Sequence, residues 1–315
     1  MRFKALSHYD GDTDTRFGDC ILLHDGRSLV VYDCGHERHT EEVKRFLLSH
    51  PAISQVHIVV SHNDSDHTDG VCPLLEWLSS EGGYNVWVYT HQYLKYTDDI
   101  LKKVADGRRK SQESMNEALL AEFDNIRAVI ETAEKLEFEA IEALPGTKVG
   151  TCEIVGPTID QFTDVAAQAV DKRIGNHIGG SKEGETVMNA ASVQLKCTLE
   201  NGERVLLCGD ATPLYLNDLD SYNIIQLPHH GQLDDAKAIF NDLQDPYTKT
   251  FFISDNTGSG KTSGGSDKLK GFMKEENYVE ALNTQNGVVT LPAKGSGVHN
   301  PKRQGVILGA LDCKH

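Results

Sequence analysis

No run of apolar residues in this chain of 315 approaches the roughly eighteen needed to cross a membrane. Residues 1–6 also lack the apolar core of a signal peptide, so we expect a soluble cytoplasmic protein without membrane contact. Cysteine is sparse: the seven thiols are scattered and form no Cys-x-x-Cys pair, which argues against a disulfide framework. They are expected to be reduced and mostly buried, as small apolar residues.

Positive charge is scarce as well, with 31 lysines and arginines against 47 aspartates and glutamates and a net charge of −16. Such an excess of acid repels a polyanion at long range and counts against broad nonspecific DNA binding. It does not exclude a nuclease, because metal ions can neutralise the reacting phosphate. The densest basic cluster lies within 102–110 and fits a solvated helix end better than a phosphate-binding patch.

A nucleotide-binding loop is also missing. Gly260-Lys261-Thr262 resembles the end of one, but the glycine required five positions earlier is Asp255. We expect instead a Gly/Ser loop at the mouth of a cleft, where Lys261 could contact a phosphate. His36 and His39, which follow the first pair of strands, are expected at the surface.

The apolar pattern predicts an α/β fold with paired sheets and helices outside. Strands are expected at 20–23, 28–32, 58–60, 86–89, 192–197, 204–208, 222–227 and 250–253, and helices at 40–48, 71–78 and 268–275. No clean linker interrupts the chain, so we expect residues 1–315 to form one domain.

Residues 92–136 break this alternation and are expected to form a helical insertion. Its apolar residues mark one face of a long amphipathic helix: Met115, Leu119, Phe123, Ile126, Ile130 and Ala133. Such a helix either covers the sheet or shapes a substrate pocket.

The most informative segment is 61–70, which follows an apolar run and contains four potential metal ligands within six residues: His62, Asp64, Asp66 and His67. Imidazole nitrogens and carboxylate oxygens both bind divalent first-row metals. A polar turn would explain the aspartates but requires neither histidine. The segment therefore predicts a metal site at the end of a strand.

Further polar residues follow other apolar runs, where the edge of a sheet can present them to the same cleft. These are Asp33, Asp210, and the pair His229-His230 before Gly231. A carboxylate between two cations can bridge them, and Asp210 is the predicted bridge.

Together these motifs resemble the metallo-β-lactamase-fold hydrolases, which carry a His-x-His-x-Asp-His loop, then Gly-Asp and a later histidine, on an αββα sandwich. They are most similar to the hydrolase domain of bacterial competence DNA-uptake channel proteins, in which the second loop histidine is an aspartate, as Asp64 is here. The resemblance includes 18–22, 33–35, 189–193 and 227–231, and it leaves the helical insertion unmatched.

The resemblance implies two divalent metal ions. One would be held by His62, Asp64 and Asp210, and the other by Asp66, His67, His229 and Asp210. Asp66 would also contact the attacking water. Most members have a further histidine where this chain has Asn189, which together with Asp64 leaves the first site rich in oxygen. Such a site either favours manganese or magnesium or fills only when a substrate phosphate supplies a ligand. His177 either supplies the missing imidazole or lies at the surface. His230 either acts as a general acid or hydrogen-bonds the backbone at the end of its strand.

The leading hypothesis is a dimetal phosphodiesterase or nuclease that acts on DNA, RNA or a nucleotide through a metal-activated hydroxide. The alternative is a zinc-dependent hydrolase of small molecules such as lactones, thioesters or β-lactams, because the fold supports these reactions too. A degenerate binding module without catalysis ranks third, since it predicts lost ligands.

Overall fold

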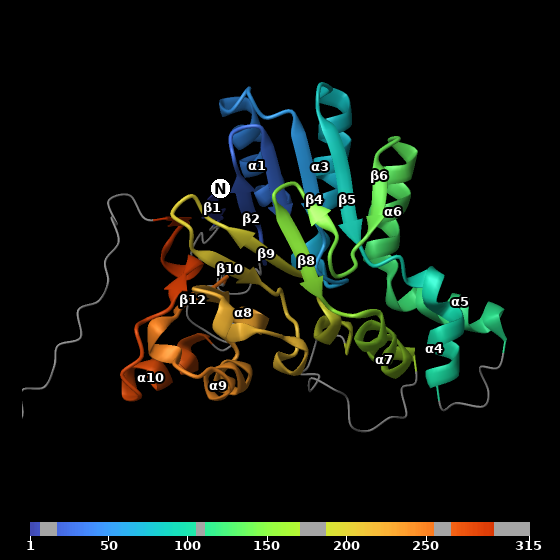
Figure 1. Cartoon of the computed structure of the whole chain (residues 1–315). Helices are drawn as coiled ribbons and strands as arrows, with labels where there is room; N and C mark the ends of the chain where they lie inside the picture. The colour runs from blue at the N-terminus through green and yellow to red at the C-terminus, as the bar shows by residue number, and fades with distance from the viewer. Residues whose placement is uncertain (7–17, 105–110, 171–186, 255–265, 293–315) are drawn as a thin grey trace, which may run out of the picture.

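The chain is arranged in four layers, in which two sheets lie face to face between two layers of helices (Figure 1). The computed structural model describes residues 1–6, 18–104, 111–170, 187–254 and 266–292. This arrangement confirms the predicted αββα sandwich. His177, Lys261 and the basic residues at 108–110 lie outside the described residues.

Each sheet has seven strands, antiparallel at one end and parallel at the other. The order in the first sheet is β14 (Val289–Leu291), β1 (Arg2–Ala5), β2 (Ile21–His24), β3 (Ser28–Tyr32), β4 (Gln55–Val59), β5 (Asn85–Thr90) and β6 (Glu139–Glu142). The order in the second is β13 (Leu282–Asn283), β12 (Thr250–Ile253), β11 (Ile224–Gln226), β10 (Arg204–Leu207), β9 (Gln194–Thr198), β8 (Cys152–Gly156) and β7 (Lys148–Val149).

The longer helices cover the outer faces of the sheets, and none among the described residues is long and apolar enough to cross a bilayer. Those packed with the first sheet are α1 (Glu37–Ser49), α3 (Val71–Glu81) and α6 (Asp124–Lys135). Those packed with the second are α9 (Leu233–Asp242) and α10 (Ser266–Glu275). Others are α4 (Thr97–Lys103), α5 (Gln112–Glu122), α7 (Ile159–Val170), and the short helices α2 (Ser65–Thr68) and α8 (Pro228–Gly231). Single 3₁₀ turns are η1 (Tyr93–Tyr96), η2 (Val187–Ala191), η3 (Pro213–Tyr215), η4 (Leu219–Ser221), η5 (Pro246–Thr248) and η6 (Thr284–Asn286).

Strand β3 shows how the pattern of the sequence builds these layers. Every residue of β3 is buried, and alternate side chains enter different cores because successive residues of a strand face opposite ways. Leu29 and Val31 pack under the helices, whereas Val30 and Tyr32 pack between the sheets. The Tyr32 hydroxyl also donates a hydrogen bond to the Val193 carbonyl of the opposite sheet at 2.6 Å. The sandwich is thus joined by polar as well as apolar contacts.

The helical insertion is not one long helix, which corrects that expectation. Phe123 has φ −121° and ψ 36°, so the helix breaks there into α5 and α6. Instead of continuing the α5 ladder, the first turn of α6 bonds to Asn63: the Ile126 amide donates to its side-chain oxygen at 3.0 Å, and its side-chain amide donates to Asp124 at 3.1 Å. The apolar periodicity continues across the break because the buried residues of α5 and α6 pack into the same core.

His39 is buried, contrary to the surface position predicted for it, while His36 is partly buried and caps α1 by accepting a hydrogen bond from the Arg38 amide. Helix α1 begins at Glu37, three residues earlier than the sequence indicated. His39 therefore lies one helical turn before Val43 on the face packed against the sheet, whereas the sequence pattern began the helix only at residue 40.

Candidate metal centre

The loop after β4, residues 61–69, is attached to the end of β3 by Asp33. The Ser61 amide and hydroxyl each donate to one oxygen of the Asp33 carboxylate at 2.7 Å. Because β3 and β4 are parallel neighbours, their carboxyl ends meet at one edge of the sheet. The loop is therefore held at its first residue, and α2 turns its later side chains back toward the other sheet.

His62, His67 and Asp210 form the first group of potential metal ligands, and all three are buried. The Asp210 Oδ2 lies 3.9 Å from His62 Nε2 and 3.6 Å from His67 Nε2. Asp64 Oδ2 approaches His62 Nε2 at 3.8 Å. Neither imidazole Nε2 has a hydrogen-bond partner, although both are buried. Two buried nitrogens thus face carboxylates across a space too wide for a direct hydrogen bond.

The other ring nitrogen of each imidazole, Nδ1, is hydrogen-bonded to a neighbouring side chain. His67 Nδ1 lies 2.9 Å from Asp33 Oδ2, and His62 Nδ1 lies 2.9 Å from the Ser61 hydroxyl and 3.2 Å from that of Ser192. Such contacts to Nδ1 orient a metal-binding histidine and leave Nε2 free to bind. The two rings are therefore fixed with Nε2 toward Asp210.

Asp19, His67 and His230 form a second, overlapping group. His230 Nδ1 donates to the Ser254 carbonyl at 2.7 Å and lies 3.4 Å from Asp19 Oδ1, and its Nε2 is 3.2 Å from Asp66 Oδ2. Its Nε2 is also 3.9 Å from Asp210 Oδ2. This imidazole connects both sheets at the centre of the cluster.

His229 approaches the cluster from its backbone. Its amide donates to Asp210 Oδ1 at 3.2 Å, and its Nδ1 lies 2.8 Å from Asp235 on α9. Both His229 and His230 have left-handed backbones, with φ 51° and 50°. Non-glycine residues rarely adopt this conformation without support from their surroundings, and it clusters at functional sites.

Charge is strongly coupled within the cluster. Burial alone would raise the pKa of Asp210, but the surrounding imidazoles of His230 and His67 more than offset it and hold that pKa well below its usual range. Burial would likewise raise the pKa of Asp66, yet the contact with His230 lowers it. Both carboxylates are consequently ionised, which metal binding requires.

The histidines of the cluster differ in the direction in which their pKa values are shifted. Burial, followed by the charge of His67, lowers the pKa of His62, so this ring is neutral and ready to bind a metal. Burial would also lower the pKa values of His67 and His230, but Asp210 and further carboxylates raise both well above the usual value. A bound cation would replace the proton on such a ring.

The residues present fit divalent cations. Buried imidazole nitrogens without partners, ionised carboxylates around them, and Nδ1 atoms held by second residues are the donors and supports that such ions need. Asp210 lies within 4 Å of three imidazoles, which is where a bridging carboxylate would lie.

The structure brings most of the residues predicted from sequence to one place. His62, Asp64, Asp66, His67 and Asp210 converge, with His229 and His230 beside them. Asn189 is buried in η2 near Ser192, whose hydroxyl donates to its carbonyl at 2.7 Å.

Asp19 was missed as a candidate ligand. It is buried, and its Oδ2 accepts a hydrogen bond from the Gln226 side-chain amide at 2.7 Å. Its place in the motif at 18–22, just before a buried strand, was the signal in the sequence that could have pointed to it. The residue before it, Gly18, packs closely on the loop of residues 61–69, here called the metal loop. A Cβ on Gly18 would lie 1.6 Å from the Asp66 carbonyl oxygen. Such a contact cannot be read from the sequence, since 47 residues separate the two positions along the chain.

No protein-family model matches the chain, and no curated protein is similar to it in sequence. Solved structures are similar in fold. The metallo-β-lactamase fold protein YhfI from Bacillus subtilis is 12% identical, with a TM-score of 0.38 over 72% of this chain and 70% of that one. A metallo-β-lactamase HARLDQ-motif mutant from Cronobacter sakazakii is 15% identical, with a TM-score of 0.34 over 85% and 81%. Identities of this size say nothing of activity or substrate.

Proposed function

We propose that this protein is a hydrolase dependent on two divalent metal ions, and that it cleaves phosphodiester bonds in nucleic acids or nucleotides. One observation carries the proposal: the Asp210 carboxylate lies 3.6–3.9 Å from the Nε2 atoms of His62, His67 and His230, at the meeting point of both sheets. Buried carboxylates and imidazoles are seldom gathered in this way without a cation.

The ligands of the first ion would be His62, Asp64 and Asp210. Those of the second would be Asp66, His67, His229 and Asp210. For His229 the contact of Nδ1 with Asp235 supports this role, because it repeats the arrangement of His67 with Asp33 and leaves Nε2 to the metal.

When bound, two such ions lower the pKa of a shared water and offset the charge of the phosphate. Asp66 and His230 are the residues of this chain that would move protons. Asp66 would accept a hydrogen bond from the attacking water. His230 holds one proton at Nδ1 through the Ser254 carbonyl, so its exchangeable proton is at Nε2, beside Asp66, from where it would protonate the leaving oxygen.

The balance of donors favours phosphoryl chemistry. Asp64, Asp66 and Asp210 supply carboxylate oxygens around a few imidazoles, a composition that suits manganese or magnesium. The resemblance of the loop motif to competence DNA-uptake proteins points in the same direction.

A second candidate is a zinc-dependent hydrolase of neutral small molecules. The net charge of −16 supports it, because an acidic chain disfavours approach of a polyanion. A module without catalysis is the weakest candidate, since the predicted ligand positions are filled and converge.

The test is to assay the purified protein with bis(p-nitrophenyl) phosphate, linear DNA, RNA, cyclic dinucleotides and a chromogenic lactam, each with manganese, magnesium or zinc. We expect phosphodiester cleavage with manganese, and a loss on the order of 10³-fold in Asp210→Asn, since metal ions contribute several kcal/mol to catalysis. Asp218→Asn, an exposed aspartate on the same connection, is the matched control and should keep full activity. Turnover of the lactam alone would overturn the phosphodiesterase proposal.

A further inference from the structure

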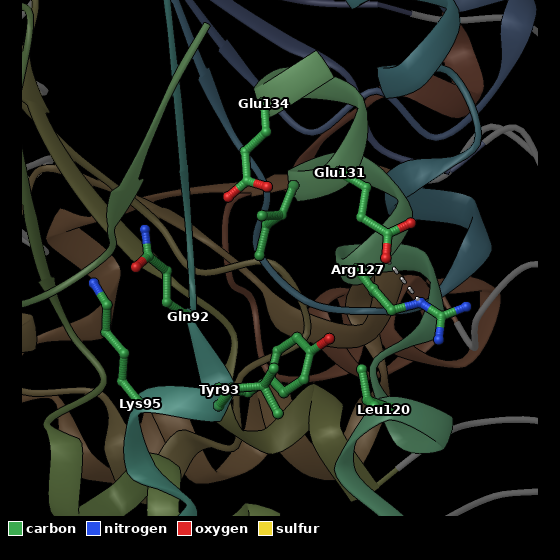
Figure 2. A pocket seen from close by; sticks show the side chains of 9 residues that line it. Gln92, Tyr93, Lys95, Leu120, Arg127, Glu131 and Glu134 are labelled. Carbon is green, nitrogen blue, oxygen red and sulfur yellow. Dashed lines mark ion pairs between the residues drawn. The ribbon is translucent and has the colours of Figure 1, made fainter. Parts of the chain in front are cut away.

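A pocket of about 320 Å³ lies within the helical insertion, and none of the candidate metal ligands lines it (Figure 2). Its apolar lining comes from Tyr93 and Leu94 on η1, Leu120 on α5 and Ile130 on α6. The ring of Tyr93 is fixed by stacking on Phe123, with centroids 4.5 Å apart. A preformed apolar hollow of this size is typical of a small-molecule site.

Charged side chains of both signs line the same pocket. Figure 2 shows Lys95 on one side and Glu131, Glu134 and Arg127 on the other. The ion pairs that these side chains form within the protein are long: Arg127 Nε lies 3.7 Å from Glu131, and Lys95 Nζ lies 3.8 Å from Glu142.

Other surface pairs of this protein are closer. The Lys–carboxylate contacts within α1 and α4 measure 2.7 and 2.8 Å. The Arg127–Glu131 pair is exposed, and a long exposed pair contributes little free energy, so both of its members can still hydrogen-bond a ligand. Lys95 is itself exposed and lies at long distance from Glu142, so it too can bond a ligand.

We propose that this pocket binds a short apolar peptide with free ends, whose occupancy is coupled to the metal loop. The peptide ammonium would face Glu134 and Glu131, its carboxylate would face Lys95, and its apolar side chain would cover Tyr93 and Ile130. A zwitterion matches this lining because a ligand of a single charge would pair with only one of Glu134 and Lys95.

The coupling follows from Asn63, which lies between two candidate metal ligands and holds the start of α6. Its backbone carbonyl accepts a hydrogen bond from the Asn125 side chain at 2.7 Å, in addition to its side-chain bonds with Ile126 and Asp124. Helix α6 supplies Arg127, Ile130, Glu131 and Glu134 to the pocket. A ligand that shifts or stiffens α6 therefore acts directly on the backbone of the metal loop.

Binding is tested by calorimetric titration of the dipeptide leucyl-phenylalanine into the full chain. We expect saturable binding that weakens about tenfold in Glu134→Gln or Lys95→Gln, since each removes a charged hydrogen-bond partner. Glu117→Gln, an exposed change of equal charge on α5 outside the pocket, should leave the affinity unchanged. The proposal would be overturned if the wild type did not bind the dipeptide. It would also be overturned if Glu134→Gln bound the dipeptide, and the wild type bound its N-acetylated amide, with the affinity of the wild type for the dipeptide.

Coupling is tested by measuring the dissociation constant of Mn²⁺ with and without saturating dipeptide. We expect a change of at least about fivefold in the wild type and less than twofold in Asn63→Ala. Asn125→Ala removes one part-buried hydrogen bond of the connection and serves as the test if Asn63→Ala unfolds. Its change in Mn²⁺ affinity should lie between about twofold and fivefold. Asn116→Ala removes a bond to Thr97 inside the insertion and should retain the wild-type change. An unchanged Mn²⁺ affinity in the wild type would overturn the coupling. Both readouts are binding constants, so neither depends on hydrolase activity.

Discussion

At the scale of single residues, Asp33 illustrates how a side chain can support the proposed metal site without being one of its ligands. Its carboxylate binds the Ser61 amide and hydroxyl and also His67 Nδ1, so it orients both the loop and one proposed ligand. Its backbone is left-handed, with φ 58°, a conformation that asparagine tolerates as readily as aspartate.

We predict that Asp33→Asn lowers Mn²⁺ affinity by about 10- to 100-fold, the usual effect of losing a residue that orients a ligand. The loss arises because an amide no longer favours the proton on His67 Nδ1 and leaves Nε2 less basic. Calorimetric titration of the metal checks this, with circular dichroism to confirm folding. Asp98→Asn, at an exposed position of α4, is the matched control. An affinity equal to that of the control would exclude this role for Asp33.

A second residue, His57, is buried between the sheets in the middle of β4. It is 6% exposed, stacks on Trp87 with centroids 4.7 Å apart, and bonds the Tyr89 hydroxyl at 3.1 Å. Burial lowers its pKa from 6.5 to about 4. The folded protein therefore keeps this imidazole neutral where the unfolded chain takes up a proton.

Stability should accordingly fall as the pH decreases from 6.5 toward 4. Between pH 7.5 and pH 5 we predict that the wild type loses about 2 kcal/mol more than His57→Phe, which keeps the stacking but does not titrate. Urea unfolding at a series of pH values checks this difference. Parallel curves for wild type and His57→Phe would contradict the prediction.

At the scale of elements, the approach of β2 to the metal loop depends on Gly18. Its φ is +61°, and a Cβ there would meet the Asp66 backbone oxygen, which accepts a hydrogen bond from the Asp19 amide at 3.0 Å. The strand and the loop are thus in direct backbone contact, and a methyl group between them must displace one or the other.

We predict that Gly18→Ala lowers both the free energy of unfolding and the affinity for Mn²⁺. Gly26→Ala is the matched control, because Gly26 has φ +97° but no atom within 4 Å of an added Cβ. It should lose only the about 1–2 kcal/mol of a left-handed alanine and keep its metal affinity. Chemical denaturation and metal titration of both variants measure the two effects. Equal metal affinities would show that the loop tolerates the displacement.

The elements also show where sequence patterns stop being sufficient. The hairpins at 20–32 and 192–208 were predictable because alternation and Asp-Gly or Asn-Gly turns act over a few residues. The break at Phe123 was not, since its cause is Asn63 in a distant loop. When a contact with a distant residue ends a helix, the apolar period of the sequence can continue past that end, so the pattern does not reveal the break.

At the scale of the whole molecule, charge sets how substrates approach. The net charge of −16 repels an anionic substrate, and salt screens that repulsion as the Debye length falls from about 30 Å at 0.01 M to about 8 Å at 0.15 M.

We predict that kcat/KM for a dinucleotide substrate rises with salt over this range, by up to roughly tenfold, whereas turnover of a neutral ester is constant. Initial rates with Mn²⁺ held saturating measure both. A rate that falls with salt would instead reveal a local basic surface that attracts the substrate.

By itself, the sequence determined the candidate ligands, their positions at strand ends and the layered α/β architecture, because side-chain chemistry and periodicity are local properties. Only the tertiary structure decided which of those residues meet. It placed Asp210 among three imidazoles, brought Asp19 beside His230 and joined Asn63 to α6. These contacts join positions far apart in the chain, and the packing of two sheets and their helices, rather than any short pattern, brings them together.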